Sequence, residues 1–235
     1  GVDVRLGKRV DADQLRAEGF DDVVIATGVS PRVPDIPGVD HPCVVSYVDV
    51  LTGAAVPGRR VAVIGAGGIG FDVAEYLLGD PDEGLRPEAF FAAWGVDAAG
   101  ATAGGLTGPL PDHRGNTTRA ITMLQRKDEP LGRRLGRSTG WILKSRLRRA
   151  GVQMVSGVHY DAIDDDGLHY TAADTTHVLP VDTVVLCAGQ DSARDLHDQL
   201  AARGITARLI GGAHVAAELD AVAAIDQATR LALSL

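Results

Sequence analysis

A glycine-rich turn between an apolar run and a helical pattern is the stretch whose residue types and spacing can do chemistry. The apolar run is Val61–Ile64, and a helical pattern follows it to Leu78. Between them lies the spacing of a dinucleotide fingerprint, carried by Gly65, Ala66, Gly67, Gly68, Ile69 and Gly70. The first glycine permits the tight turn, the second lets the backbone approach a pyrophosphate, and the third lets helix and strand pack closely. Because the helix N-terminus also offers free N–H groups to an anion, the stretch predicts a dinucleotide site.

Two basic residues follow the next predicted strand and bear on which nucleotide binds. Arg126 and Lys127 come directly after the apolar run 120–124. An acid at this place binds the ribose 2′-OH of NAD, whereas a basic residue accommodates the 2′-phosphate of NADP. Glu88 lies nearer the usual interval of about 20 residues, but it does not follow a strand pattern. We therefore expect NADPH, with a solvated strand end as the alternative interpretation.

Other charged and ionisable residues bear on catalysis, metal binding and the steering of a cofactor. Nine basic residues lie between positions 126 and 149, either as a rim that steers a polyanionic cofactor or as a solvated helix face. The seven histidines form no HxxxH pair, and no Ser-His-Asp order stands out. Because the cofactors perform the chemistry in hydride transfer, we expect no catalytic residue and no metal site.

Composition limits the class of protein. The chain has 235 residues, a formal net charge of -8 and 45% hydrophobic residues, which fit one or two globular α/β domains. The acidic charge argues against nucleic-acid partners, and no run of 18 apolar residues predicts a membrane span. The two cysteines form no CxxC pattern and suit a reducing cytoplasm. The first residue is Gly1, without an initiator methionine, so we expect a processed product or a piece of a longer chain.

The elements that position these residues are predicted from periodicity and turn residues. Strands are expected at 2–6, 20–28, 61–64, 120–124, 152–155, 182–189 and 207–212, with a hairpin turn at Asp166-Gly167. Ser138 or Thr139 is expected to cap a helix that stops at Gly151. A terminal helix is expected over 216–233, with its apolar face at Leu219, Val222, Ile225 and Leu231. Residues 79–119 read as an insertion with some structure of its own.

The strand ending at Gly189 repeats the scheme of the strand ending at Gly28, with an acid, an apolar run and a terminal glycine. This echo suggests two related nucleotide domains, although a structural turn explains each glycine almost as well. The predicted fold class is α/β: a Rossmann-like three-layer NAD(P)-binding domain with a β-meander, plus an incomplete FAD-binding Rossmann-like domain.

Several short motifs together resemble one family from end to end. They are ATG at 26–28, GAGGIGFD at 65–72, LQRK at 124–127, STGW at 138–141, DDDGLHY at 164–170, CAGQ at 187–190, IGG at 210–212 and AAELDA at 216–221. The sequence resembles the C-terminal part of bacterial NADPH-dependent 2,4-dienoyl-CoA reductase, an iron–sulfur flavoprotein of fatty acid β-oxidation. Trimethylamine-dehydrogenase-like and enoate-reductase-like parents are near alternatives, and a non-catalytic NADP(H)-binding or interaction module is an alternative of another class.

The resemblance implies a division of the chain and a set of cofactor contacts. Residues 1–56 would be a partial FAD-binding domain and linker, 57–190 the NADPH-binding domain, and 191–235 the returning segment of the FAD domain. Gly189 and Gln190 would belong to the NADPH side. Contacts to FAD in the intact parent would come from Thr27, Gly28, Gly211 and Gly212.

Family members carry FMN and a four-iron cluster (4Fe-4S) in a barrel domain, and electrons pass from NADPH to FAD and onward to the dienoyl thioester. This sequence lacks the barrel, the cysteine cluster and the first GxGxxG of the FAD domain. We therefore expect FAD to be absent or weakly held, and the missing barrel and FAD-domain portion to be the partners. The chain alone is not expected to reduce dienoyl-CoA.

Overall fold

The computed structural model describes residues 1–79, 85–108, 119–217 and 220–235. These residues divide into two compact units, each taken here by itself. Unit 1 comprises Gly1–Ser30 and Gln190–Leu235, and unit 2 comprises Pro31–Gly189. Residues 31–56, grouped by sequence with the FAD portion and linker, lie in unit 2, because β3 (Val44–Ser46) pairs there with β10 (Thr183–Leu186).

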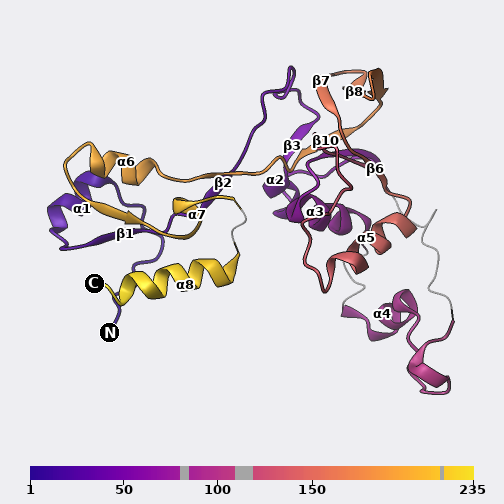
Figure 1. Cartoon of the computed structure of the whole chain (residues 1–235), viewed down its shortest axis with the longest axis horizontal. Helices are drawn as coiled ribbons and strands as arrows, with labels where there is room; N and C mark the ends of the chain where they lie inside the picture. Colours follow the sequence, from indigo (N-terminus) through magenta and orange to yellow (C-terminus); the bar gives the residue numbers. More distant parts are fainter. Residues whose placement is uncertain (80–84, 109–118, 218–219) are drawn as a thin grey trace. The chain divides into compact units, whose positions relative to one another are not determined.

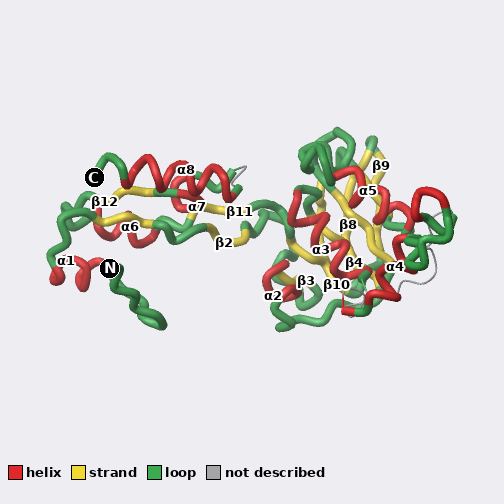
Figure 2. The backbone as a smooth tube through the Cα atoms, turned by 90° about the horizontal axis from the view of Figure 1, so that it is seen from below, coloured by secondary structure: helices red, strands yellow, loops and turns green. Residues whose placement is uncertain are grey.

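Unit 2 is built on a five-stranded parallel sheet (Figures 1 and 2). The strand order is β3-β10-β4-β5-β6, with β4 at Arg60–Ile64, β5 at Ala120–Leu124 and β6 at Gln153–Val155. The central strand, β4, pairs with β10 on one side and with β5 on the other. A parallel sheet needs both faces covered, which explains the near-continuous apolar runs of its inner strands.

Each face of this sheet has its own hydrophobic core. Successive side chains of β4 point to opposite faces, so the strand contributes to both cores. Val61 and Val63 join the core under the helices, whereas Ala62 and Ile64 join the core under the antiparallel strands. The helices are α2 (Tyr47–Leu51), α3 (Gly68–Leu78) and α5 (Gly140–Arg149). The opposite layer is a meander of β7 (His159–Asp164), β8 (Gly167–Ala172) and β9 (Thr175–Leu179). The predicted three-layer α/β fold with a β-meander is confirmed.

Local sequence explains where several elements begin and end. Ser46 caps α2 through a capping box with Asp49. The helix expected after Thr139 begins at Gly140, although Thr139 makes no capping bond with its side chain. Gly151, at φ +84°, follows the end of that helix, as predicted. The turn before Gly167 joins β7 to β8, which confirms the expected hairpin.

The described part of the 79–119 insertion has structure of its own, as predicted. It contains helix α4 (Pro87–Trp94), a short 3₁₀ helix (Ala103–Gly105) and a bridge between Val96 and Leu106. The guanidinium of Arg146 lies 5.5 Å from the centre of the Trp94 ring. This cation–π contact joins the insertion to α5.

The described residues of unit 1 form two short strand pairs and four helices. Strand β1 (Val23–Ile25) runs parallel to β12 (Ala207–Leu209), and β2 (Val29–Pro31) pairs with β11 (Gln190–Ser192). The helices are α1 (Ala12–Glu18), α6 (Asp195–Ala201), α7 (Gly211–His214) and α8 (Ala221–Ala232). Its core contains Ala12, Ile25, Leu200 and Ala213.

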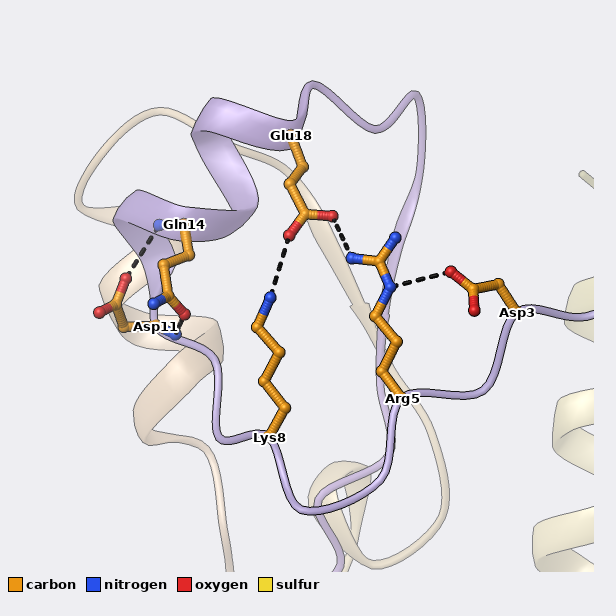
Figure 3. Close-up of polar contacts among 6 residues, drawn as sticks. All are labelled: Asp3, Arg5, Lys8, Asp11, Gln14 and Glu18. Atoms are coloured by element: carbon orange, nitrogen blue, oxygen red, sulfur yellow. Dashed lines mark hydrogen bonds and ion pairs between the residues drawn. The ribbon is translucent and has the colours of Figure 1, made fainter.

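The prediction of a strand at residues 2–6 is wrong. This segment is exposed and has no strand partner among the described residues. Ion pairs tether it instead: Arg5 Nη1 lies 2.9 Å from Glu18 Oε2, and Lys8 Nζ lies 3.8 Å from Glu18 Oε1. Figure 3 shows Glu18 of α1 reaching both cations. Exposed pairs of this kind stabilise a segment only weakly.

The C-terminal expectations are partly wrong. The strand expected to 212 ends at Leu209, and Gly211 begins helix α7. The terminal helix begins at Ala221, where Asp220 accepts a hydrogen bond from the Ala223 N–H. Of its expected apolar face, Val222 and Ile225 are 77% and 65% exposed, and α8 contacts Gly211 of α7 through Ala224 and Gln227 instead. Leu219 lies outside the described residues.

Asp182 ties the start of β10 to the start of β4. Its carboxylate accepts hydrogen bonds from the main-chain N–H groups of Arg59 and Arg60 and from the Arg60 guanidinium. The side-chain bond to Arg60 is the main cause that lowers the pKa of Asp182 to about 2. An ordinary Asp titrates near pKa 3.9. The folded state therefore favours the charged form of Asp182.

We predict that Asp182→Asn lowers the free energy of unfolding at pH 7, and that the difference from wild type shrinks on acidification. A lowered folded-state pKa stabilises fully above the unfolded pKa of about 4 and is lost as the pH falls toward 2. Urea titrations between pH 7 and pH 2.5 measure the difference. Asp35→Asn is the control, because Asp35 is an exposed residue of the same unit. A constant difference for Asp182→Asn throughout would contradict the assignment.

Candidate functional site

The carboxyl ends of β4, β5 and β10 meet at one edge of the sheet in unit 2, where α/β folds bind ligands. The main chain leaves β4 at Gly65, whose N–H donates to the Leu124 carbonyl of β5 at 2.9 Å. Gly65 has φ +109°, and a Cβ there would lie 2.2 Å from the Cys187 carbonyl oxygen. Only glycine fits this turn, because both the conformation and the space exclude a side chain.

The other glycines of the turn differ in their surroundings. A Cβ on Gly70 would lie 2.0 Å from the Gly65 carbonyl oxygen, so α3 packs directly on the turn. Nothing lies within 4 Å of a Cβ on Gly67 or Gly68. Gly67 is the N-cap of α3 and has no side chain with which to cap the first N–H groups of the helix. This arrangement offers backbone donors and the helix dipole to an anion.

A cleft of about 280 Å³ opens beside this turn. It is lined on one side by Gly65, Ala66 and Gly67, and on the other by the turn that follows β5. Four basic residues line it: Arg126, Lys127, Arg133 and Arg134. Glu129 also lines it and pairs with Arg133 at 3.2 Å. The cleft therefore carries net positive charge next to free backbone donors, which suits a molecule with several phosphates.

The meander and β10 complete the cleft. Tyr160 of β7 is 8% exposed, and its hydroxyl donates to the Leu124 carbonyl at 2.9 Å. Burial raises the pKa of Tyr160, and the positive charge of Arg126 opposes that rise. Cys187 follows β10, and burial raises the pKa of its thiol to about 12. Both groups therefore stay neutral near pH 7.

The sequence-predicted residues are brought together only in part. The cleft is lined by six of them: Gly65, Ala66, Gly67, Arg126, Lys127 and Gly189. Gly68 and Ile69 are in the first turn of α3, with Ile69 packed against the helix-side core. Gly70 is buried under the turn, and Gln190 begins β11 in unit 1. Of these four, none is among the lining residues.

The residues expected to contact FAD lie in unit 1. Thr27 lines an open cleft of about 1030 Å³ together with Lys8 and Arg9. Gly28 has φ +74°, and its carbonyl accepts the Ala193 N–H. Gly211 and Gly212 form the start of α7, where the Gly211 N–H donates to Gln227. The expected set therefore does not line a single cleft among the described residues.

Other residues considered from the sequence lie in helices outside the cleft lining. Arg146, from the basic stretch, pairs with Glu75 of α3 at 2.9 Å, and Glu88 lies in the first turn of α4. Four of the nine basic residues line the cleft, and a steering role for them stays a prediction. Within the part of the chain that the structure describes, no group of three His, Cys, Asp or Glu side chains is arranged to hold a metal ion. No described helix combines the length and apolar character needed to cross a membrane.

Sequence reasoning missed Gln125, Glu129 and Tyr160 as cleft residues. Gln125 and Glu129 had a local signal, because they flank the basic pair in the chain. Tyr160 had none, since it reaches Leu124 from 36 residues further along the chain.

The residues of unit 2 fit a phosphorylated dinucleotide. Backbone space at Gly67 and the uncapped N-terminus of α3 would accept its pyrophosphate. Arg126 and Lys127 provide cations at the end of β5, where the ribose of such a nucleotide lies. The fold and the cleft thus define an NAD(P)-binding region of Rossmann type.

Comparison with known proteins places this region in a family. Residues 2–219 match the pyridine nucleotide-disulphide oxidoreductase family, and the chain belongs to it. A metal reductase of Desulforamulus reducens is 28% identical over 217 residues, which are 91% of this chain and 31% of the relative. A bilirubin reductase of Mediterraneibacter gnavus is 41% identical over 76 residues, which are 32% of this chain and 12% of the relative. The chain spans less than a third of the length of these relatives.

Solved structures share the fold. A 2-naphthoyl-CoA reductase in complex with 2-naphthoyl-CoA superposes with a TM-score of 0.71 at 22% identity, over 98% of this chain and 29% of that one. Histamine dehydrogenase from Rhizobium sp. 4-9 superposes with a TM-score of 0.66 at 18% identity, over 97% of this chain and 32% of that one. The chain therefore shares its fold with these structures and has the Rossmann-like region of the pyridine nucleotide-disulphide oxidoreductase family.

We predict that Gly70→Ala destabilises the protein, whereas Gly68→Ala does not. The new Cβ of Gly70→Ala would lie 2.0 Å from a main-chain oxygen, which should cost about 1–3 kcal/mol of unfolding free energy. At Gly68 the same methyl group meets open space in the first turn of a helix. Denaturant unfolding of both variants measures this difference. Equal stability of the two variants would contradict the packing described for the turn.

Proposed function

We propose that this chain is the NADPH-binding electron-entry module of a flavin-dependent oxidoreductase similar to bacterial NADPH-dependent 2,4-dienoyl-CoA reductase. The observation that carries the proposal is the basic turn at Arg126-Lys127 in the same cleft as the glycine turn. Several relatives are reductases by name, which is consistent with a reductive direction.

The chain's own residues would bind and orient the nucleotide. The N–H groups at the start of α3 would bind its pyrophosphate, and Arg126 and Lys127 would bind the 2′-phosphate. The neutral Tyr160 and Cys187 form the wall of the cleft. When bound, the nicotinamide would supply a hydride to the FAD of the parent protein.

The remaining parts of the reaction belong to the proposed parent. Its barrel with FMN and the 4Fe-4S cluster, and the rest of the FAD-binding domain, are the partners in this proposal. The sequence resemblance supports them, together with the small share of its relatives that this chain spans. We expect the 235-residue chain to bind NADPH and to leave dienoyl-CoA unreduced.

We predict that Arg126→Ala weakens NADPH binding about ten- to a hundredfold, because a charge-assisted bond to the 2′-phosphate is lost. NADH lacks that phosphate, so its Kd should stay within about twofold. Calorimetric titration with each nucleotide measures both constants. Arg137→Ala removes the same charge from a residue outside the cleft lining and serves as the control. Equal losses of affinity for NADPH and NADH would contradict the assignment of Arg126 to the 2′-phosphate.

The alternative is a module that binds NADP(H) and transfers no electrons. The unit 1 cleft favours the redox proposal, because it places Thr27 beside Lys8 and Arg9, where a flavin nucleotide could bind. Because FAD is expected to be held weakly, absorption spectroscopy of the purified chain in excess FAD separates the two. We predict that NADPH bleaches the flavin absorption under anaerobic conditions faster than it does without the chain. A chain that binds NADPH but does not speed the bleaching would support the binding module.

A further inference from the structure

The basic turn after β5 is folded by one side chain. The Gln125 carboxamide Nε2 donates to the carbonyls of Lys127, at 3.0 Å, and Glu129, at 2.5 Å. These two bonds use both of its N–H donors. The main chain of Gln125 is fixed as well, because its N–H donates to Val155 and its carbonyl accepts the Val158 N–H. Residues 125–129 are thus held as one turn against β6 and the start of the meander.

The end of β5 is also tied to the glycine turn through one carbonyl group. The Leu124 oxygen accepts the Gly65 N–H at 2.9 Å and the Tyr160 hydroxyl at 2.9 Å. Tyr160 is buried and belongs to the meander, so the contact joins three parts of unit 2 at one atom. Neither Tyr160 nor Gln125 has a charge with which to bind a phosphate.

The chemistry of a phosphorylated dinucleotide explains why this matters. Its pyrophosphate and its 2′-phosphate are parts of one molecule, so the two anions can bind together only at a limited range of separations. If the protein already holds its two anion sites at the separation of these phosphates, binding does not cost the free energy of ordering the sites. A mobile basic turn would have to be ordered when the 2′-phosphate binds. This would weaken the binding of NADPH and leave the binding of NADH, which has no 2′-phosphate, unchanged.

We propose that Gln125 and Tyr160 are positioning residues that set the preference for NADPH over NADH, by holding Arg126 and Lys127 at a fixed place beside the glycine turn. This inference rests on the proposed function, because it assigns the 2′-phosphate to the basic turn. The two residues act through the cations and touch no reacting atom.

The first test replaces Gln125 by methionine, which keeps the length of the side chain and removes its donors. Gln125→Met should raise the Kd for NADPH about tenfold and leave the Kd for NADH within about twofold. Gln153→Met is the matched control, because Gln153 is an exposed residue of the neighbouring strand β6 outside the cleft lining. It should change neither constant.

The second test removes one hydroxyl. Tyr160→Phe should raise the Kd for NADPH about threefold to tenfold, again with little effect on NADH. Tyr170→Phe is its control, since Tyr170 lies directly opposite on β8 and stacks on His177 outside the cleft lining. This variant keeps the inference testable if Gln125→Met does not fold.

A double-mutant cycle distinguishes positioning from general stability. In a background that carries both Arg126→Ala and Lys127→Ala, Gln125→Met should cost no further NADPH affinity. A loss that persists in this background, or equal losses for NADPH and NADH, would overturn the inference. If wild type prefers NADPH and both Gln125→Met and Tyr160→Phe keep that preference, only this inference fails. If wild type shows no preference for NADPH, the proposed function fails with it.

Discussion

The turn that leaves β4 is wedged between the ends of two neighbouring strands, and the rest of the site depends on that close approach. Gly65 donates its N–H to β5, while the Ile64 carbonyl accepts the Cys187 N–H that follows β10. A side chain at Gly65 would collide with the Cys187 carbonyl oxygen. Because three parallel strands end at this point, the segments that follow them are brought to one cleft. A glycine turn, a basic turn and the Ala188-Gly189 edge therefore share a site although they are far apart in the chain.

The two cores of unit 2 give this site its two walls. On the helix side, α3 packs against the sheet through Phe71 and Val73, and Gly67, its N-cap residue, lines the cleft. On the other side, the meander buries Tyr160 and Ile163 and brings the Tyr160 hydroxyl to the end of β5. Because successive side chains of β4 face opposite cores, α3 lies on one side of the glycine turn. The hydrogen bond between Tyr160 and the Leu124 carbonyl lies on the other side.

Local patterns predicted the parts of the structure that local physics decides. The glycine spacing predicted the turn, apolar runs predicted β4, β5 and β10, and Asp166-Gly167 predicted the hairpin of the meander. The basic pair was also visible, because it follows its strand directly. Within the site, the contact of Tyr160 with Leu124 was not predictable, since it depends on β7 folding back over the sheet.

Two sequence predictions were wrong because no described segment pairs with or packs against the residues concerned. Residues 2–6 have an apolar alternation, but a strand also needs a neighbour for its hydrogen bonds. In α8, Val222 and Ile225 lie on a face that no described element covers, so periodicity alone assigned them to a core they do not join. Both cases lie in unit 1, whose parallel pair of β1 and β12 has only two strands. Parallel sheets are normally larger and covered on both faces.

The most direct test of the account is a crystal structure of the chain with NADP⁺. We expect the pyrophosphate at the N-terminus of α3, beside Gly67, and the 2′-phosphate within hydrogen-bond distance of Arg126 or Lys127. A nucleotide whose 2′-phosphate faces solvent away from these cations, or one bound only in the unit 1 cleft, would contradict it.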